Sequence, residues 1–552
     1  MPSFTTTVAG RTGPRTAAFV GAAVAAAVTL PALGAGTLWD NSETAYGEVA
    51  REILVTRDWL VMHQHLHPWY VQPPLYFWLA AIAAQLLGVN GIALRLPSAL
   101  ATIAMGALAG WTGARLMGPR AGIFSALILS TALEQAIIGR LAIMDALLDL
   151  CLTATTLLWY RAAEHDDRRA FVLGWIWAAF GTLAKGPVAV LLPGLIASAY
   201  AAWNTRRGRS WPRLSATAWA AAIGLYVVVA LPWFVAVYAR AGSAFLDQFF
   251  GQYTFGRYLG VVENQTGPIW YYIPVVILAF FPWVAFLPWA FWTAARDGAR
   301  NVVKEAPFLR YLVVWTTVTL IFYSLAKTKL PNYVASALPA MAWLVALWWE
   351  RSLEAGRLRA ARISAATVPM TILLLAIAIA LFARTMHFTQ QATWLMPYLI
   401  VLGSIVFAGS LLTFVLLWVP AASAAAPLAL ACASIGAMMA TAFIGVPHAD
   451  ALKPVPRLAR EINALRRPGD RIGILGVSGG NALAFYTEPN AEALTNDGNA
   501  TRDFVCSAPR AFVIISERRL AAQPSFGRHL RVVDHADGAA LVLFDGPPCD
   551  GG

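Results

Sequence analysis

The sequence predicts an all-helical protein that crosses a membrane many times and carries a small α/β domain at its C-terminal end. Hydrophobic residues make up 59% of the chain and charged residues only 13%, against roughly 25% charged residues in an ordinary globular domain. Apolar stretches recur from residue 17 to residue 446, and the composition after residue 446 is that of a soluble domain. A disordered chain, a coiled coil and a soluble multidomain enzyme are therefore excluded.

Thirteen apolar stretches are predicted to be transmembrane helices, because a helix needs about 20 apolar residues to cross the hydrocarbon core. Leu75–Leu87 is also apolar, but it is too short to span, and we expect a re-entrant or interfacial helix there. The predicted spans are 17–38, 96–112, 121–138, 146–160, 170–184, 187–203, 215–238, 268–293, 311–326, 333–349, 363–383, 394–418 and 425–446.

The basic residues test this assignment. The net charge is +12, and residues 447–552 contain equal numbers of basic and acidic residues, so the whole excess lies in residues 1–446. With a cytoplasmic N-terminus, nineteen Lys and Arg of this part fall in cytoplasmic segments and ten on the other side. The positive-inside rule therefore favours thirteen spans in a bacterial inner membrane, with a periplasmic C-terminus. Nucleic-acid binding is not expected, because no soluble domain has a basic face.

Two domains are predicted. Residues 1–446 form the transmembrane domain, with interfacial helices in its outer loop at 39–95, and residues 447–552 form a periplasmic α/β domain. Cys506 and Cys549 both lie in this outer domain, where disulfides persist, but the spacing leaves open whether they pair. The predicted elements are a helix at Pro456–Arg467 and strands at Arg471–Val477, Ala511–Ser516, Leu530–Val533 and Ala540–Phe544.

Acidic residues stand out at the outer ends of the predicted helices. Apolar residues recur at helical spacing after Asn41. Asp40 and Glu43 at this start fit either a helix cap or two carboxylates of which one is a general base. Asp145 begins a later helix and also fits either a cap or a polar site. Asp149, one turn further on, favours the polar site, because ionisable residues inside spans are commonly functional.

Basic residues and histidines also occur on the outer side. One basic residue there would be a snorkelling anchor, whereas several opposite carboxylates favour a site for a phosphate or pyrophosphate. In an extended segment, alternating histidines would share one face and could bind a divalent metal; the alternative is part of an aromatic belt. The basic residues include Arg95, Lys185, Arg257, Lys327 and Lys329, and the histidines are His63, His65 and His67.

The sequence has no P-loop, Rossmann fingerprint, metalloprotease helix or Ser-His-Asp pattern. It resembles the GT-C membrane glycosyltransferases, in particular the bacterial relatives of protein O-mannosyltransferases and the lipid A aminoarabinose transferases. The resemblance covers nearly all of residues 30–350. Its motifs are Trp39-Asp40 with Glu43-x-x-Tyr46, Val49-Ala50-Arg51-Glu52, Asp58-Trp59, Gln72-Pro73-Pro74-Leu75-Tyr76-Phe77-Trp78, Arg95-Leu96-Pro97-Ser98-Ala99-Leu100, Asp145, Ala184-Lys185-Gly186-Pro187, Pro268-Ile269-Trp270-Tyr271-Tyr272 and Lys329-Leu330-Pro331-Asn332-Tyr333.

The resemblance implies a hexosyl or pentosyl transferase that moves a sugar from a polyprenyl-phosphate donor to an acceptor hydroxyl or phosphate on the periplasmic side. The acceptor would be a lipid A-like lipid, another glycolipid, a glycan or a protein, and the remaining partners inner-membrane lipids. If a divalent metal takes part, its expected neighbours are Asp40, Glu43 and the histidines His63, His65 and His67; no other cofactor is expected. The implied catalytic residues are Asp40, Glu43 and Asp145; the implied phosphate-binding residues are Lys185, Arg257, Lys329, Tyr333 and Arg95; and the implied substrate-pocket residues are Tyr46, Gln72 and Tyr76.

Two positions depart from the family pattern. The two adjacent acids of the family are Ser42 and Glu43 here, so the base is Asp40 or Glu43. The family's Lys-Pro-Pro is Gln72-Pro73-Pro74, which leaves the acceptor open. The alternative function is a multi-spanning transporter or flippase of a lipid-linked substrate. A transporter should show two related halves, but the sequence has no internal repeat and its unusual charges gather on one side. A purely structural membrane protein would not need those charges.

Overall fold

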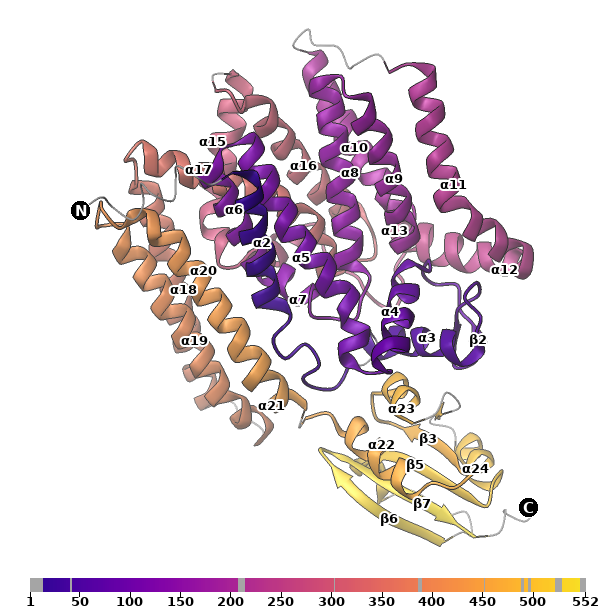
Figure 1. Ribbon diagram of the computed structural model, residues 1–552. Helices are drawn as coiled ribbons and strands as arrows, with labels where there is room; N and C mark the ends of the chain where they lie inside the picture. Colours follow the sequence, from indigo (N-terminus) through magenta and orange to yellow (C-terminus); the bar gives the residue numbers. More distant parts are fainter. Residues whose placement is uncertain are drawn as a thin grey trace.

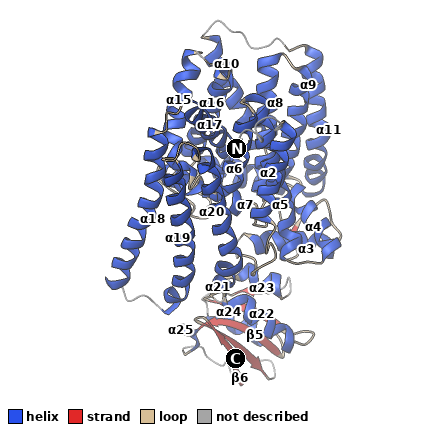
Figure 2. Ribbon diagram, turned by 60° about the vertical axis from the view of Figure 1, so that its left-hand side comes forward, coloured by secondary structure: helices blue, strands red, loops and turns tan. Residues whose placement is uncertain are grey.

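The computed structural model describes residues 13–546 except 40–41, 207–213, 302, 386–389, 451, 488–490, 495–497 and 522–528. Most of the chain is a bundle of helices, and a small domain with a β-sheet lies beyond one end of it (Figures 1 and 2). The bundle helices are α2 (Pro14–Thr29), α5 (Gly91–Leu116), α6 (Pro119–Thr131), α7 (Leu133–Ile138), α8 (Asp145–His165), α9 (Arg168–Lys185), α10 (Val188–Thr205), α11 (Ala216–Ala241), α14 (Tyr272–Ala279), α15 (Leu287–Arg300), α16 (Ala306–Leu325), α17 (Leu338–Glu354), α18 (Arg359–Thr385), α19 (Gln390–Leu416) and α20 (Ala426–Ala440).

Every predicted span overlaps at least one helix, and the interfacial helix predicted at Leu75–Leu87 has those bounds as α4. Within the described residues, six helices are by themselves long and apolar enough to cross a membrane, and a bent pair of helices would make seven. The chain is therefore a polytopic membrane protein, while the total of thirteen spans stays a prediction.

Three predicted spans differ clearly from the observed helices. The stretch 121–138 is divided between α6 and α7, because Ala132 between them has an extended backbone. The stretch 17–38 is helical only to Thr29, because Pro31 cannot continue the hydrogen-bonding pattern and Ala32 has a positive φ. The stretch 268–293 is not one straight helix: α14 and the segment Trp283–Arg300 meet at 112°. Pro282 lies at this break, where a missing backbone donor favours a bend.

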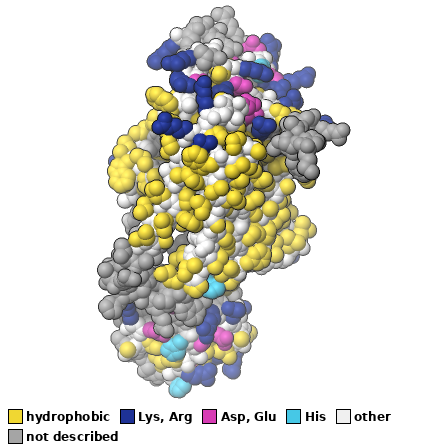
Figure 3. Space-filling model, turned by 90° about the vertical axis from the view of Figure 1, so that its left-hand side faces the viewer, with side chains coloured by type: hydrophobic (Ala, Val, Ile, Leu, Met, Phe, Trp, Pro, Cys, Tyr) yellow, Lys and Arg dark blue, Asp and Glu magenta, His cyan; other side chains and the backbone are white. Residues whose placement is uncertain are grey.

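Close helix packing at the N-terminal side depends on small residues. A side chain at Gly21 of α2 or at Gly106 of α5 would collide with the backbone of the facing helix. Small residues permit this backbone approach, which is a common way for helices to associate in membranes. Hydrophobic side chains cover the middle of the bundle, and Lys and Arg side chains gather at the end away from the β-sheet (Figure 3).

The shorter elements lie mainly at the end of the bundle that faces the sheet. There α3 (Glu43–Thr56) and α4 lie beside the hairpin of β1 (His63–Gln64) and β2 (His67–Pro68) (Figure 1). The remaining short segments connect the bundle helices. They are α12 (Ser243–Leu246), η1 (Asp247–Phe255), α13 (Gly256–Leu259), η2 (Trp283–Phe286), η3 (Pro331–Ala337), η4 (Ser423–Ala425), η5 (Thr441–Gly445) and α21 (Val446–Asp450).

The C-terminal part contains a five-stranded sheet in the order β4-β3-β5-β7-β6, with β3 parallel to β4 and β5, and β7 antiparallel to β5 and β6. Alternate residues of its central strands pack into two apolar cores, one on each face. The predicted helix and all four predicted strands are present, and Cys506 is disulfide-bonded; Cys549 lies outside the described residues. The elements are α22 (Pro454–Leu465), β3 (Arg471–Leu475), α23 (Gly480–Tyr486), β4 (Glu492–Ala493), α24 (Gly498–Cys506), β5 (Arg510–Ser516), α25 (Glu517–Leu520), β6 (His529–Ala536) and β7 (Ala539–Asp545).

Candidate functional site

Asp145 is the centre of a polar cluster at the end of the bundle beside α3 and α4. It is the first residue of α8, and one carboxylate oxygen, Oδ1, accepts a hydrogen bond from Lys185 Nζ at 2.5 Å and one from Asn332 Nδ2 at 2.6 Å. Lys185 ends α9, and Asn332 lies in η3. Asp145 and Lys185 are both largely buried. Because the ion pair is shielded from water, each charge fixes the position of the other.

A cavity of about 310 Å³ opens beside this cluster. Two further predicted residues, Arg257 and Tyr333, line it together with Asp145 and Lys185. The Lys185 ammonium lies over the Tyr333 ring, 5.4 Å from its centroid, and Arg257 pairs with Glu263 at 3.1 Å. The cavity therefore brings two cations and a phenol to one wall, an arrangement that suits an anionic group such as a phosphate.

Tyr46 and Gln72 approach the cluster from the first outer loop. Gln72 is buried and lines the cavity. Burial raises the pKa of Tyr46 to about 12, and Lys185, Asp145 and Arg257 are among the charges that act on its hydroxyl. The Tyr46 ring is held edge-on by aromatic rings of the loop and of α4. A neutral hydroxyl is therefore fixed beside the charged residues.

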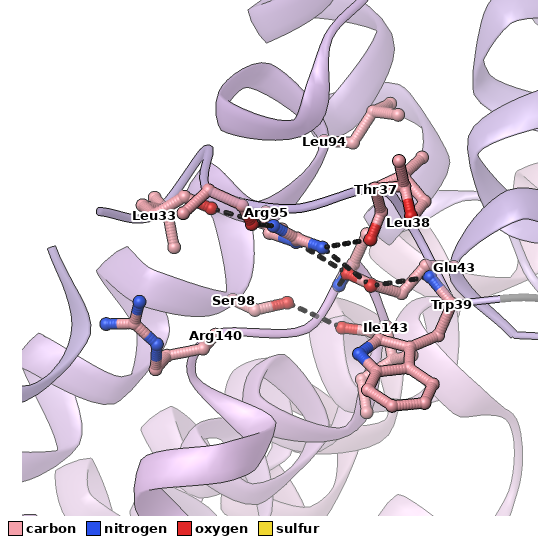
Figure 4. A network of polar contacts seen from close by, with 12 residues as sticks. Leu33, Thr37, Leu38, Trp39, Glu43, Leu94, Arg95, Ser98, Arg140 and Ile143 are labelled. Carbon is pink, nitrogen blue, oxygen red and sulfur yellow. Dashed lines mark hydrogen bonds and ion pairs between the residues drawn. The ribbon is translucent and has the colours of Figure 1, made fainter. Parts of the chain in front are cut away.

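Glu43 occupies a separate position and has no contact with the cavity. Arg95 Nε donates to Glu43 Oε1 at 2.7 Å, and Arg95 Nη2 donates to Oε2 at 2.8 Å (Figure 4). The backbone amides of Ala142 and Trp39 donate to the same two oxygens, at 2.7 and 3.0 Å. Glu43 is fully buried, and each of its oxygens thus accepts two hydrogen bonds.

Arg95 and Lys329 are not among the residues that line this cavity. Besides Glu43, Arg95 donates to backbone carbonyls of residues 33–37 (Figure 4). Lys329 Nζ donates to the carbonyls of Ser324 at 2.8 Å and Ala326 at 2.7 Å, at the end of α16. A buried cation must satisfy its donors, and these two satisfy them with protein groups.

Tyr76 and the histidines also depart from the sequence-based expectation. The Tyr76 hydroxyl donates to the carbonyl of Leu94 and is fully buried, so the residue packs the interior of the outer loop. The three histidines do not lie in one extended segment, because the chain turns at His65 and Leu66, which both have positive φ. His63 and His67 thus fall on the two strands of a hairpin. No three His, Cys, Asp or Glu side chains of the described residues gather in a way that could hold a metal ion. Asp40 lies outside the described residues.

The sequence reasoning did not select Asn332, although the residue lies within one of the quoted motifs. Its amide joins η3 to Asp145 of α8 across 187 positions of the chain. An amide beside Tyr333 is the only local signal, and it does not reveal a partner so far away in sequence.

The chain is similar to several known proteins. Residues 71–235 match the family described as dolichyl-phosphate-mannose-protein mannosyltransferase. The chain is also similar to three proteins named undecaprenyl phosphate-alpha-4-amino-4-deoxy-L-arabinose arabinosyl transferase. The one from Erwinia tasmaniensis is 29% identical over 314 residues, 56% of this chain and 55% of that protein. The one from Aeromonas salmonicida is 30% identical over 333 residues, 59% of each. The one from Pseudomonas aeruginosa is 31% identical over 314 residues, 56% of this chain and 55% of that protein.

The chain thus spans between half and two thirds of the length of these relatives. Two crystal structures of ArnT from Cupriavidus metallidurans have the same architecture. The one bound to undecaprenyl phosphate has a TM-score of 0.75 at 21% identity and covers 95% of this chain and 97% of that chain. The apo structure has a TM-score of 0.76 at 20% identity, with the same coverage. The predicted resemblance is confirmed, and the chain has the GT-C fold.

Proposed function

We propose that the chain is an integral-membrane glycosyltransferase that moves a sugar from a polyprenyl-phosphate donor to an acceptor hydroxyl or phosphate. One observation carries the proposal: Asp145, Lys185, Arg257 and Tyr333, from distant parts of the sequence, line one cavity at one end of an apolar bundle. A donor with a long isoprenoid tail needs such a place, where its phosphate meets cations and its tail stays in lipid. The similarity to arabinosyl transferases that use undecaprenyl phosphate supports the same reaction class.

The two cations are proposed to stabilise the negative charge of the leaving phosphate. When the bond between the sugar and the phosphate breaks, negative charge develops on the polyprenyl phosphate, and fixed positive charges nearby lower the barrier. Lys185 and Arg257 line the cavity from two different segments. In this proposal they bind the phosphate, the Tyr333 hydroxyl donates to it, and Asp145 and Asn332 hold Lys185 in place.

The acceptor needs a base, and Asp40 is the residue that we propose for it. The alternative, Glu43, already accepts four hydrogen bonds, two of them from the Arg95 guanidinium. Protein donors thus surround both oxygens of Glu43, which leaves little room for an acceptor hydroxyl to bind there. We therefore assign Glu43, Arg95 and Lys329 to positioning, and Tyr46 and Gln72 to the substrate pocket.

The proposed reaction takes place on the periplasmic side of the inner membrane. The first outer loop, whose Gln72 lines the cavity, contacts the C-terminal domain through hydrogen bonds of Leu38 and Arg51. The Lys- and Arg-rich end of the bundle lies away from that domain (Figure 3). The positive-inside rule places the basic end in the cytoplasm. The N-terminus is then cytoplasmic, and residues 447–552 form a periplasmic domain.

Turnover by the purified protein in lipid nanodiscs tests the proposal. The donors are radiolabelled undecaprenyl-phosphate pentoses and hexoses, and the acceptors are lipid A, glycolipids and peptides. We expect sugar transfer, its loss in Lys185→Met, and full activity in the matched control Lys327→Met, since Lys327 is exposed and does not line the cavity. Movement of the donor lipid between leaflets with no transfer to any acceptor would favour the transporter instead.

The same assay tests the predicted divalent metal and the base. Loss of turnover with EDTA, restored by Mg²⁺ or Mn²⁺, would support a metal, and unchanged turnover would remove it from the proposal. Asp40→Asn should abolish transfer. Full turnover in that variant would show that another group takes the acceptor proton.

A further inference from the structure

A second carboxylate, Asp149, lies in the same cavity and has no role in the cluster around Asp145. It is one turn further along α8, so the two side chains fall on the same face of the helix. Asp149 lines the cavity, yet its side chain is only 3% exposed. Its neighbour Asp145 is paired with Lys185. Asp149 has no ion-pair partner among the described residues, and its buried Oδ2 accepts no hydrogen bond.

An unpartnered carboxylate in a helix bundle is unfavourable for folding. Burying a polar group that makes no hydrogen bond is unfavourable, and an apolar side chain at this position would avoid that cost. Ionisable groups kept inside membrane helices therefore point to a functional site. The missing partner of Asp149 must be a hydrogen-bond donor that enters the cavity.

The chemistry of the proposed donor leaves one part that can supply this hydrogen bond. The phosphate of the donor is a diester, and its free oxygens can only accept hydrogen bonds. The isoprenoid tail has no hydrogen-bond donor. The sugar carries hydroxyl or amino groups, and it alone can donate to a carboxylate.

The rest of the cavity suits a sugar. Its wall combines polar side chains with aromatic rings, and several of the aromatic residues are tyrosines that also carry a hydroxyl. A ligand pocket of this kind excludes water through its apolar wall and orients the ligand through a few convergent polar groups. The aromatic residues are Phe249, Tyr253, Phe255, Tyr258, Phe322, Tyr323 and Tyr333.

We propose that Asp149 binds the sugar of the polyprenyl-phosphate donor by accepting a hydrogen bond from one of its hydroxyl or amino groups. This inference rests on the proposed function and makes it more specific. It divides the cavity into two parts, one with Lys185 and Arg257 for the phosphate and one with Asp149 for the sugar. Asp149 thereby becomes a residue that distinguishes a donor with its sugar from the spent carrier lipid.

The test compares two ligands on the full-length protein in nanodiscs. The ligands are undecaprenyl phosphate and undecaprenyl phosphate that carries a pentose, and the variants are Asp149→Leu, Asp149→Asn and Lys185→Met. We expect Asp149→Leu to weaken binding of the sugar-bearing lipid about tenfold or more, since a hydrogen bond to a charged group is lost. Its affinity for undecaprenyl phosphate should not change. Asp149→Asn, which keeps an acceptor, should be intermediate, and Lys185→Met should weaken both ligands.

The thermal stability of the variants provides a second readout. Asp149→Leu removes the unpartnered polar group and should melt at the same temperature as the original protein or higher, which a residue with a purely structural role would not do. Unchanged affinity for the sugar-bearing lipid, or equal weakening of both ligands, would overturn the inference. If the unaltered protein binds neither lipid, the proposed function itself fails.

Discussion

Arg95 holds both carboxylate oxygens of Glu43 with two parallel hydrogen bonds, at 2.7 and 2.8 Å (Figure 4). The pair connects the first residue of α3 to α5, and both side chains are withdrawn from solvent. The outer loop that brings Tyr46 to the cavity is therefore fixed to the bundle by a charge pair in a dry environment. Removing one partner leaves an unpaired buried charge, which destabilises the folded protein more than removing both partners does.

Single and double substitutions should reveal this coupling. We expect Glu43→Gln and Arg95→Met each to destabilise the protein by about 3–5 kcal/mol, and the double variant to lose clearly less than the sum. Thermal unfolding in nanodiscs measures the effect. Additive losses would mean that the two residues act independently.

Substitution by Met should have different effects on stability and lipid affinity at Lys329 and at Lys185. Lys329 donates to carbonyls at the end of α16, so Lys329→Met should lower the unfolding temperature and leave the affinity for undecaprenyl phosphate intact. Lys185→Met should lower that affinity. The comparison requires lipid-binding isotherms and melting curves for both variants. Loss of affinity in well-folded Lys329→Met would return this residue to the phosphate site that its sequence motif predicts.

The C-terminal domain is attached to the outer loop by direct contacts. The Leu38 amide donates to the Tyr486 hydroxyl at 2.7 Å, and Arg51 donates to the carbonyls of Ala484 and Phe485. Tyr486→Phe leaves a backbone donor without its acceptor, a loss of about 1–3 kcal/mol. We expect faster amide hydrogen exchange at Leu38 and its neighbours, with Tyr238→Phe as a control, since Tyr238 is exposed. Unchanged exchange would show that the domain does not hold this segment.

The outer loop should also make stability depend on pH. Burial and a hydrogen bond with Glu48 raise the pKa of Glu52 to about 7, from an ordinary value of 4.5. Between these two values the folded state binds more protons than the unfolded state, so stability falls as the pH rises. The favourable contribution is complete below pH 4.5 and is lost as the pH passes through about 7.

Glu52→Gln should remove this dependence. We expect the unfolding temperature of the variant to change less between pH 5 and pH 8 than that of the original protein, and to be higher at pH 8. Glu461→Gln is a suitable control, since this carboxylate is exposed on α22. Parallel pH curves for Glu52→Gln and the original protein would contradict the assigned pKa.

Local patterns predicted most of the fold. The apolar run at Leu75–Leu87 and the strand patterns of the C-terminal domain gave elements close to those observed, because periodicity and length determine them locally. The bend between α14 and α15 was missed, although Pro282 lies beside it. The number of apolar residues in a stretch does not distinguish a straight transmembrane helix from a broken one.

The candidate site was only partly predictable, because its contacts join residues far apart in the sequence. The sequence placed Asp145, Lys185, Arg257 and Tyr333 on one side of the membrane, and they line one cavity. The sequence did not reveal that Arg95 forms an ion pair with Glu43, which lies 52 positions away. The histidine hypothesis assumed an extended strand and was wrong about that, because a tight turn separates His63 from His67.

A cryo-electron microscopy structure of the nanodisc-embedded protein with undecaprenyl phosphate tests the central claim most directly. The account predicts the phosphate within hydrogen-bond distance of Lys185 and Arg257, with the isoprenoid tail running from the cavity into the lipid. A phosphate bound at the Lys- and Arg-rich end of the bundle, with the cavity beside Asp145 empty, would contradict it.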